Sequence, residues 1–125
     1  MKKWIIGLVC GVVGVTAAWG QSVVINEYRN ATPDVIELVV VDDGLNLQGM
    51  LIKDYSKSGV KDGGGAFTFS SDSLWASVPA GTIIVLRKDD SAADTTVGGG
   101  DYNLDVGLQN TTYFTAGSGT FDIAT

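Results

Sequence analysis

The sequence contains no histidine, and its one cysteine, Cys10, lies within the first 20 residues. A chain without histidine lacks the base of Ser–His–Asp and Cys–His catalysis. In residues 21–125 the same absences exclude zinc sites built on histidine or cysteine, haem ligation and iron–sulfur ligation. These exclusions remove most catalytic and metal-dependent classes of protein, and we expect no cofactor.

Basic residues are also scarce, with 8 Lys and Arg against 14 Asp and Glu and a formal net charge of −6. Affinity for duplex nucleic acid depends largely on the neutralisation of phosphates by Lys and Arg. The basic residues here are few and scattered, apart from three lysines within 53–61 that lie among acidic residues. We therefore expect no binding to nucleic acid.

Residues 1–20 have a different composition from the rest of the chain. Lys2 and Lys3 precede an apolar run over 5–15, and small residues stand at Ala18 and Gly20. This order is typical of a secretory signal peptide, and the run is shorter than the roughly 20 residues of a membrane-spanning helix. We predict a leader helix that is removed after Gly20, contact with the membrane only before cleavage, and a secreted or cell-surface product with a net charge near −8, because two lysines are lost.

The remaining residues, 21–125, suit one domain that is held together by its core, because no cysteine is left for a disulfide. Short apolar or alternating runs separated by Gly, Ser and Asp indicate an all-β sandwich. One helical turn is predicted within 70–78, with Ser71 or Asp72 as its N-cap and Leu74 and Trp75 directed inward. The run 35–41 is predicted to be buried on both faces because it is almost entirely β-branched. We expect strands over 22–28, 35–41, 45–54, 66–69, 82–88, 110–114 and 120–123.

The last residues, 121–125, look like a strand that has just begun. A sandwich without its closing strand would expose an unpaired edge. We therefore expect the domain to be incomplete at its C-terminal end, with its last strand missing.

Two sets of residues resemble catalytic groups. Glu27 and Glu37 could form the carboxylate pair of a glycosidase, but we expect each to be structural and to accept backbone or side-chain hydrogen bonds where the first two strands meet. Ser58 and Lys61 have the S-x-x-K spacing of serine acyltransferases. That chemistry needs a helical turn, which the neighbouring glycines disfavour, so we interpret the match as coincidental and expect no enzyme activity.

Two further sets suggest binding. Asp101, Asn103 and Asp105 place oxygen ligands at alternate positions, as in the first half of a calcium loop. The turn glycine is displaced and position 112 is threonine instead of glutamate, so a solvated turn is the favoured interpretation and weak calcium binding stays open. Four aromatic residues, Trp75, Tyr102, Tyr113 and Phe114, are expected in the core. The alternative is that they form an exposed platform on which sugars stack.

Five segments in order carry a family resemblance: Val24-Ile25-Asn26-Glu27, then 35–40, then 45–49 with Asp54, then 67–69 with Leu74 and Trp75, and finally 78–86. Together they resemble the bacterial secreted branch of the lamin tail domain family over residues 23–125. Val35 and Met50 replace tryptophans that are usual in that family. The motif residues, which the resemblance makes structural, are Asn26, Glu27, Glu37, Gly49 and Gly81.

The resemblance implies an immunoglobulin-like β-sandwich with no catalytic residues of its own. Such domains accompany secreted nucleases, phosphatases and cell-surface proteins. We therefore expect a non-catalytic module that attaches to a protein or to a component of the cell surface. The alternatives are an accessory domain of a secreted nuclease or phosphatase whose catalytic part is absent from this chain, and a carbohydrate-binding module.

Overall fold

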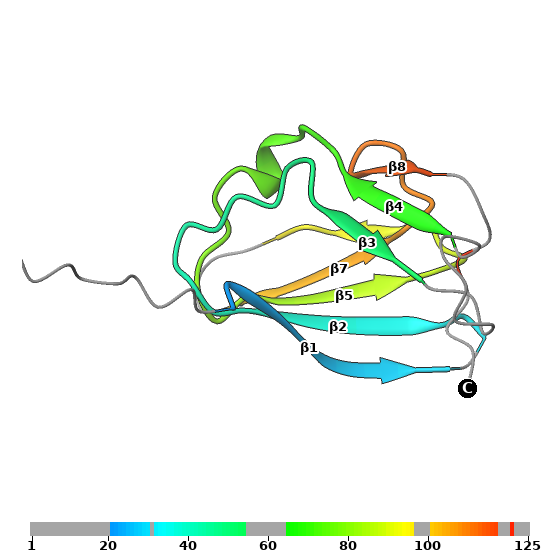
Figure 1. Ribbon diagram of the computed structural model, residues 1–125, viewed down its shortest axis with the longest axis horizontal. Helices are drawn as coiled ribbons and strands as arrows, with labels where there is room; N and C mark the ends of the chain where they lie inside the picture. The colour runs from blue at the N-terminus through cyan, green and yellow to red at the C-terminus, as the bar shows by residue number, and fades with distance from the viewer. Residues whose placement is uncertain (1–20, 31, 55–64, 97–100, 118–120, 122–125) are drawn as a thin grey trace, which may run out of the picture.

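The computed structural model describes residues 21–30, 32–54, 65–96, 101–117 and 121 (Figure 1). The predicted leader, Ser58 and Lys61, and all of the predicted strand 120–123 except Phe121 lie outside these residues. The described part contains eight strands and a short 3-10 helix: β1 Val23–Arg29, β2 Val35–Val40, β3 Leu51–Lys53, β4 Ala66–Phe69, η1 Ser73–Trp75, β5 Ile83–Arg87, β6 Ala93–Asp94, β7 Asn103–Gly107 and β8 Phe114–Ala116.

The strands form two sheets that lie face to face (Figure 1). The larger sheet has the order β1-β2-β5-β7-β6, in which only the β5–β7 pair is parallel. The smaller sheet has the order β3-β4-β8, with both pairs antiparallel. The prediction of an all-β sandwich is therefore confirmed.

Alternation along the strands places one face of each sheet in the core. In β2, Ile36, Leu38 and Val40 are buried, whereas Val35, Glu37 and Val39 are only half-buried. β5 and β7 repeat this alternation, because their buried residues stand opposite one another in register. The rings of Phe67, Phe69 and Phe114 project from the smaller sheet onto this apolar surface and complete the core.

Trp75 fixes the smaller sheet at one end of the core. Its side chain is fully buried, its ring meets Phe69 edge to face with centroids 4.9 Å apart, and its indole Nε1 donates to the carbonyl of Tyr113 at 2.9 Å. The 3-10 turn that carries Trp75 is capped by Asp72, whose Oδ1 accepts from the Leu74 amide at 2.8 Å. The predicted turn, its Asp72 cap and the inward direction of Trp75 are thus confirmed.

Two expectations for the middle strands are wrong. The run 35–41 is buried on one face only, because no layer of the described residues covers the outer side of the larger sheet. The predicted strand 45–54 is reduced to β3, Leu51–Lys53. Leu45 makes an isolated bridge to Val78, and Gly49 then adopts a left-handed φ of 75° that interrupts the extended chain.

The C-terminal third also differs from expectation. Residues 103–107 form the buried strand β7, which pairs with both β5 and β6, whereas the sequence favours a solvated turn over 101–105. Residues 110–113, predicted as a strand, form a turn in which the amides of Tyr113 and Phe114 donate to the carbonyl of Asn110. The apolar residues Leu104, Val106 and Leu108 alternate through β7 into the core, and the acidic residues between them concealed this strand in the sequence.

Gly81 gives a direct test of the backbone geometry. Its φ is 84°, and a Cβ placed on it would meet no atom within 4 Å. The cost of Gly81→Ala is therefore purely conformational, about 1–2 kcal/mol. Thermal unfolding should show a lower Tm for Gly81→Ala than for Gly81→Asn, because asparagine tolerates the left-handed region better. Equal Tm values for the two variants and the parent chain would contradict this assignment.

Candidate functional site

Strand β1 carries a β-bulge that decides which of its side chains face the core. Ile25 stands opposite Leu38 and Tyr28 stands opposite Ile36, with a register shift between Ile25 and Glu27. In a regular strand, residues three apart point to opposite faces. The extra residue at the bulge, Asn26, reverses the alternation, so Ile25 and Tyr28 lie on the same inner face as Ile36 and Leu38.

These two inward-facing side chains are nevertheless exposed, Ile25 at 65% and Tyr28 at 64% of their surface. Among the described residues the smaller sheet ends at β3, so its strands leave the inner side of β1 uncovered (Figure 1). Met50, next to β3, is a third exposed apolar residue at this gap. A contiguous exposed apolar surface of this kind marks a site of interaction more often than chance.

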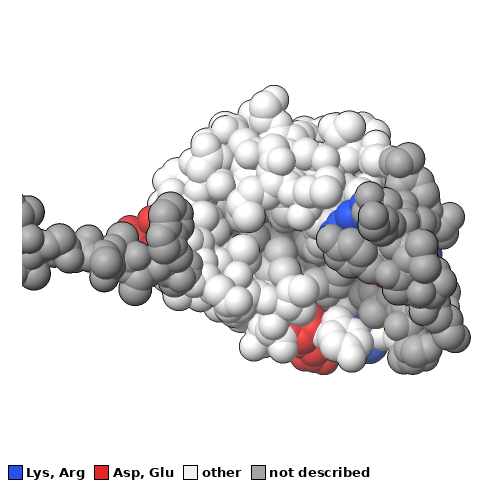
Figure 2. All heavy atoms as spheres, viewed as in Figure 1, with Lys and Arg blue, Asp and Glu red and all other residues white. Residues whose placement is uncertain are grey.

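We call this gap the open flank and define it by the apolar residues that line it. One half, of about 260 Å³, is lined by Ile25, Tyr28, Ile36, Ile52 and Phe121, with Lys53 and Asp54 at its rim. The other half, of about 360 Å³, continues along β1 and β3 past Val23, Leu38, Met50, Leu51 and Phe69. Figure 2 shows the hollow in the middle of this face, and the described atoms along its border are mostly uncharged.

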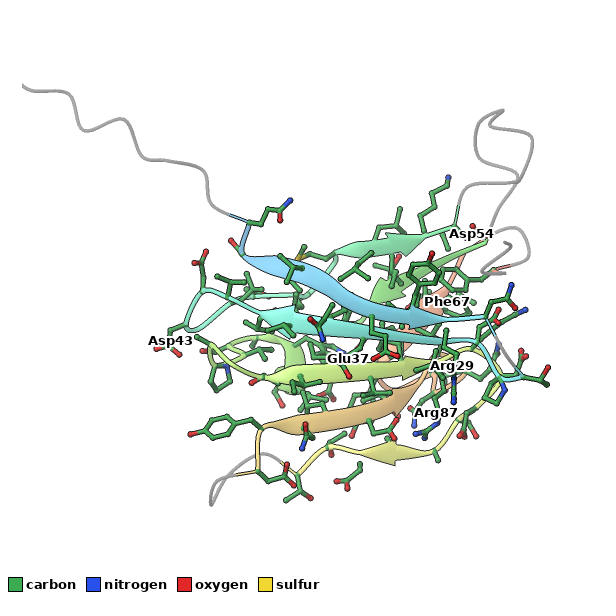
Figure 3. All side chains as sticks on the ribbon, turned by 90° about the horizontal axis from the view of Figure 1, so that it is seen from below. Arg29, Glu37, Asp43, Asp54, Phe67 and Arg87 are labelled. Carbon is green, nitrogen blue, oxygen red and sulfur yellow. The ribbon has the colours of Figure 1, made fainter. Side chains whose placement is uncertain are left out.

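The motif residues Asn26 and Glu37 meet at the bulge, on the outer face of the larger sheet. The amide Nδ2 of Asn26 donates to Oε1 of Glu37 at 2.6 Å. Glu37 points out from β2 in Figure 3, which views this face from below. Glu37 therefore accepts a side-chain hydrogen bond, which the extra residue of the bulge supplies.

Glu27 stands directly opposite Glu37 in the register, so the structure does bring the two carboxylate-bearing residues together. The hollow between them, of about 130 Å³, is lined only by Glu27, Arg29, Val35 and Glu37. It contains no aromatic ring on which a sugar could stack, and glycosidases rely on such positioning of the substrate as well as on the carboxylates. Arg29, labelled in Figure 3, instead places a positive charge beside the pair.

Arg87 organises a second group of charges on the same sheet (Figure 3). Its Nε donates to Oδ2 of Asp90 at 2.8 Å, and its guanidinium also pairs with Asp105. Burial lowers the pKa of Arg87, but the hydrogen bonds to Asp90 and Asp105 outweigh this effect and raise it. The backbone N–H of Ala92, followed by Arg87, lowers the pKa of the Asp90 carboxyl.

The candidate calcium ligands are divided among different contacts. Asp105 pairs with Arg87, and Oδ1 of Asp101 accepts from the backbone amide of Asn103 at 2.9 Å. Asn103 and Asp105 belong to the extended strand β7, which separates their side chains along the sheet instead of closing them around an ion. Within the described ranges, no group of three Asp or Glu side chains gathers as a metal site would require.

The four candidate aromatic residues do not form one exposed surface. Trp75 and Phe114 lie in the core at 0% and 2% exposure, and Tyr113 packs against Trp75 with its ring centroid at 6.1 Å. Only Tyr102 is exposed. The core interpretation is confirmed for Trp75 and Phe114, and their burial excludes a four-ring sugar platform.

The open flank was not predicted from the sequence, although a signal for it was present. Ile25 and Tyr28 are both large and apolar at a spacing of three, which does not fit the period of two of a strand. That spacing is consistent with a bulge at Asn26 or Glu27. The uncovered state of these side chains depends on the width of the other sheet, which no local pattern encodes.

Comparison with protein-family models, with curated proteins and with solved structures finds no match to this chain in any of the three. Among the described residues, no helix is long and apolar enough to cross a membrane.

The hydrogen bond between Asn26 and Glu37 should be measurable as a coupling energy. We expect Asn26→Ala and Glu37→Ala each to lower the free energy of unfolding, with a coupling of about 1 kcal/mol in the double-mutant cycle. Denaturant unfolding of the four proteins checks this value. Strictly additive effects of the two substitutions would show that the bond contributes nothing to stability.

The lowered pKa of Asp90 predicts a pH dependence of stability. Because the carboxyl titrates below its ordinary value of 3.8 in the folded chain, its contribution is present above that pH and is lost as pH falls through the folded pKa. The Tm of Asp90→Asn should therefore lie below that of the parent chain at pH 6, and the difference should shrink by pH 3. Asp89→Asn, at the neighbouring exposed carboxylate, is the matched control.

Proposed function

We propose that this chain is a non-catalytic module that attaches to a protein or to a component of the cell surface through the open flank. The single observation that carries the proposal is the exposure of Ile25 and Tyr28, at 65% and 64%, although both lie on the inner face of a sandwich. Burying a side chain of this size contributes roughly 1.5–3 kcal/mol. A partner that covered the flank would therefore gain a substantial binding energy from these two residues.

The charged side chains outside the open flank contact one another, which supports a structural role for them more than a catalytic one. Arg87 is shared between Asp90 and Asp105, and Glu37 is held by Asn26. Groups that hydrogen-bond one another on an open sheet face lack the enclosed, water-excluding setting that most catalytic sites use. On this proposal, Asn26 and Glu37 at the bulge position Ile25 and Tyr28.

The family and the location of the chain form part of the same proposal. The order of motifs around Asn26, Glu37, Gly49 and Gly81 supports a lamin-tail-like, immunoglobulin-like domain. The basic and apolar composition of residues 1–20 supports export through a signal peptide to the cell surface or the medium. If the domain accompanies a secreted nuclease or phosphatase, the sandwich itself still contributes attachment and no chemistry.

Retention at the cell surface tests this function. We expect the chain, tagged and expressed in its own host, to be recovered with the cell envelope, and the double variant Ile25→Ser/Tyr28→Ser to be released into the medium. Val41→Ser/Tyr102→Ser is the matched control, because it removes a similar exposed apolar surface elsewhere. Equal retention of the flank variant and the parent chain would refute attachment through the flank.

A further inference from the structure

Beyond the proposed function, we propose that two copies of this chain associate through the outer faces of their larger sheets. The outer face is the side of β1, β2, β5 and β7 that is turned away from the smaller sheet (Figure 3). It is opposite to the side that carries the open flank, so the flank of each copy stays free in such a dimer.

A row of acidic side chains crosses this outer face. The positions of the row stand opposite one another in the register of neighbouring strands, in the order Glu27, Glu37, Val85, Asp105 and Asp94. Residues that stand opposite one another in a sheet project to the same face. Glu37 projects outward because its neighbours Ile36 and Leu38 are buried in the core, so the whole row faces outward.

The negative charge of Asp105 is compensated within the chain, whereas that of the two glutamates is not. Asp105 pairs with Arg87. Glu37 accepts a hydrogen bond from the neutral amide of Asn26, which leaves its charge uncancelled. Among the described residues Glu27 has no ion pair, although it stands directly opposite Glu37. Like charges at directly opposed positions of a sheet destabilise the pair of strands.

Arg29 places a positive charge beside these glutamates without pairing with either. It lies two residues after Glu27 in β1, stands opposite Val35 and is exposed. All four of these residues line one hollow of about 130 Å³ on the outer face. Within the described part, Arg29 makes no ion pair. The β1 end of the face therefore holds charges of both signs that are open to an external partner.

A two-fold axis pairs these charges between two copies. Glu27 and Arg29 are about 6.6 Å apart along β1 and project to the same face. An axis that runs across the strands, above the point between these two residues, reverses β1 of the second copy and lays it over β1 of the first. Arg29 of each copy then lies over Glu27 of the other copy and next to its Glu37. The interface is isologous, because both copies contribute the same patch.

The outer face has the size that a weak dimer needs. Strands in a sheet lie about 4.8 Å apart and advance about 3.3 Å per residue, so the face measures roughly 20 Å by 20 Å on each copy. Two such faces bury a total area near the lower limit of about 1,000 Å² for a specific interface. Val35 and Val85, both half-buried, lie next to the axis and supply apolar contact between the charges.

A second copy fits this face better than other occupants do. A basic peptide would neutralise the glutamates but would place positive charge against Arg29, and an acidic peptide would have the reverse defect. A metal ion would need further ligands, and no group of three acidic side chains gathers among the described residues. A second copy carries both charges in the order that matches.

Sedimentation equilibrium of the protein purified from its own host, over concentrations that reach the millimolar range, tests the proposal. We expect a reversible monomer–dimer equilibrium that weakens as ionic strength rises, because the charge pairs are near the surface. Glu27→Arg and Arg29→Glu should each weaken the dimer about ten-fold or more, since like charges then meet across the axis. Asp89→Arg is the matched control. It makes the same change of charge at an exposed carboxylate outside the outer face and should leave the dimer unchanged.

A mixture of the two variants makes the test specific. In a mixed dimer of Glu27→Arg with Arg29→Glu, opposite charges meet at both pairs, so the equimolar mixture should recover the dimer that each variant has lost. A parent chain that stays monomeric over the whole series would overturn the proposal. A dimer that is unchanged in both single variants, or a mixture of folded variants that stays monomeric, would overturn it equally.

Far-ultraviolet circular dichroism identifies a variant that fails to fold. In that case Glu27→Gln and Arg29→Gln replace the reversals, and each should weaken the dimer by a smaller factor, because a charge pair is lost without new repulsion. Unchanged dimerisation in both of these variants would also overturn the proposal.

The flank variant separates the dimer from the proposed function. Ile25→Ser/Tyr28→Ser should dimerise like the parent chain, because both side chains lie on the inner side of β1. Loss of the dimer in this variant would place the interface at the flank and overturn the assignment to the outer face. A monomeric chain that is still retained at the cell envelope through the flank would overturn the dimer and leave the proposed function intact.

Discussion

The difference in width between the two sheets governs the rest of this structure. A five-stranded sheet faces a three-stranded one, so the apolar inner face of the larger sheet extends beyond its cover. Over β5 and β7 the cover is complete, and residues such as Ile84, Leu86 and Val106 are fully buried against the rings of the smaller sheet. Over β1 the described part of the smaller sheet provides no cover. The stable core and the exposed flank are therefore two results of the same packing.

The bulge at Asn26 decides which side chains of β1 face this gap. Without the extra residue, Ile25 and Tyr28 would point to opposite faces of β1, and at most one of them could contribute to the flank. With it, both line one hollow, while Asn26 and Glu37 hydrogen-bond on the outer face and hold the bulge in place. Asn26 and Glu37 thus help to determine which neighbouring side chains of β1 line the hollow.

Sequence patterns predicted the elements that local physics determines. The alternation in 66–69 and 82–88, the Asp72 cap and the buried Trp75 all depend on residues within a few positions of one another. The patterns failed where tertiary context decides. Acidic residues within 101–105 hid β7, because the pairing of Asp105 with Arg87 from β5 joins residues that are far apart in the sequence. Gly49 ended a predicted strand through its left-handed φ, and the open flank arises only when two sheets of unequal width meet.

Ile25 lies on the inner face of the sandwich and is still open to solvent. Solvent paramagnetic relaxation of the isoleucine methyl groups, measured by NMR on the chain without a partner, tests this exposure. Ile25 should relax strongly, close to the rate of a surface residue, whereas Ile84, which is fully buried in β5, should be protected. If the methyl group of Ile25 were as protected as that of Ile84, the flank would be closed and the account would be wrong.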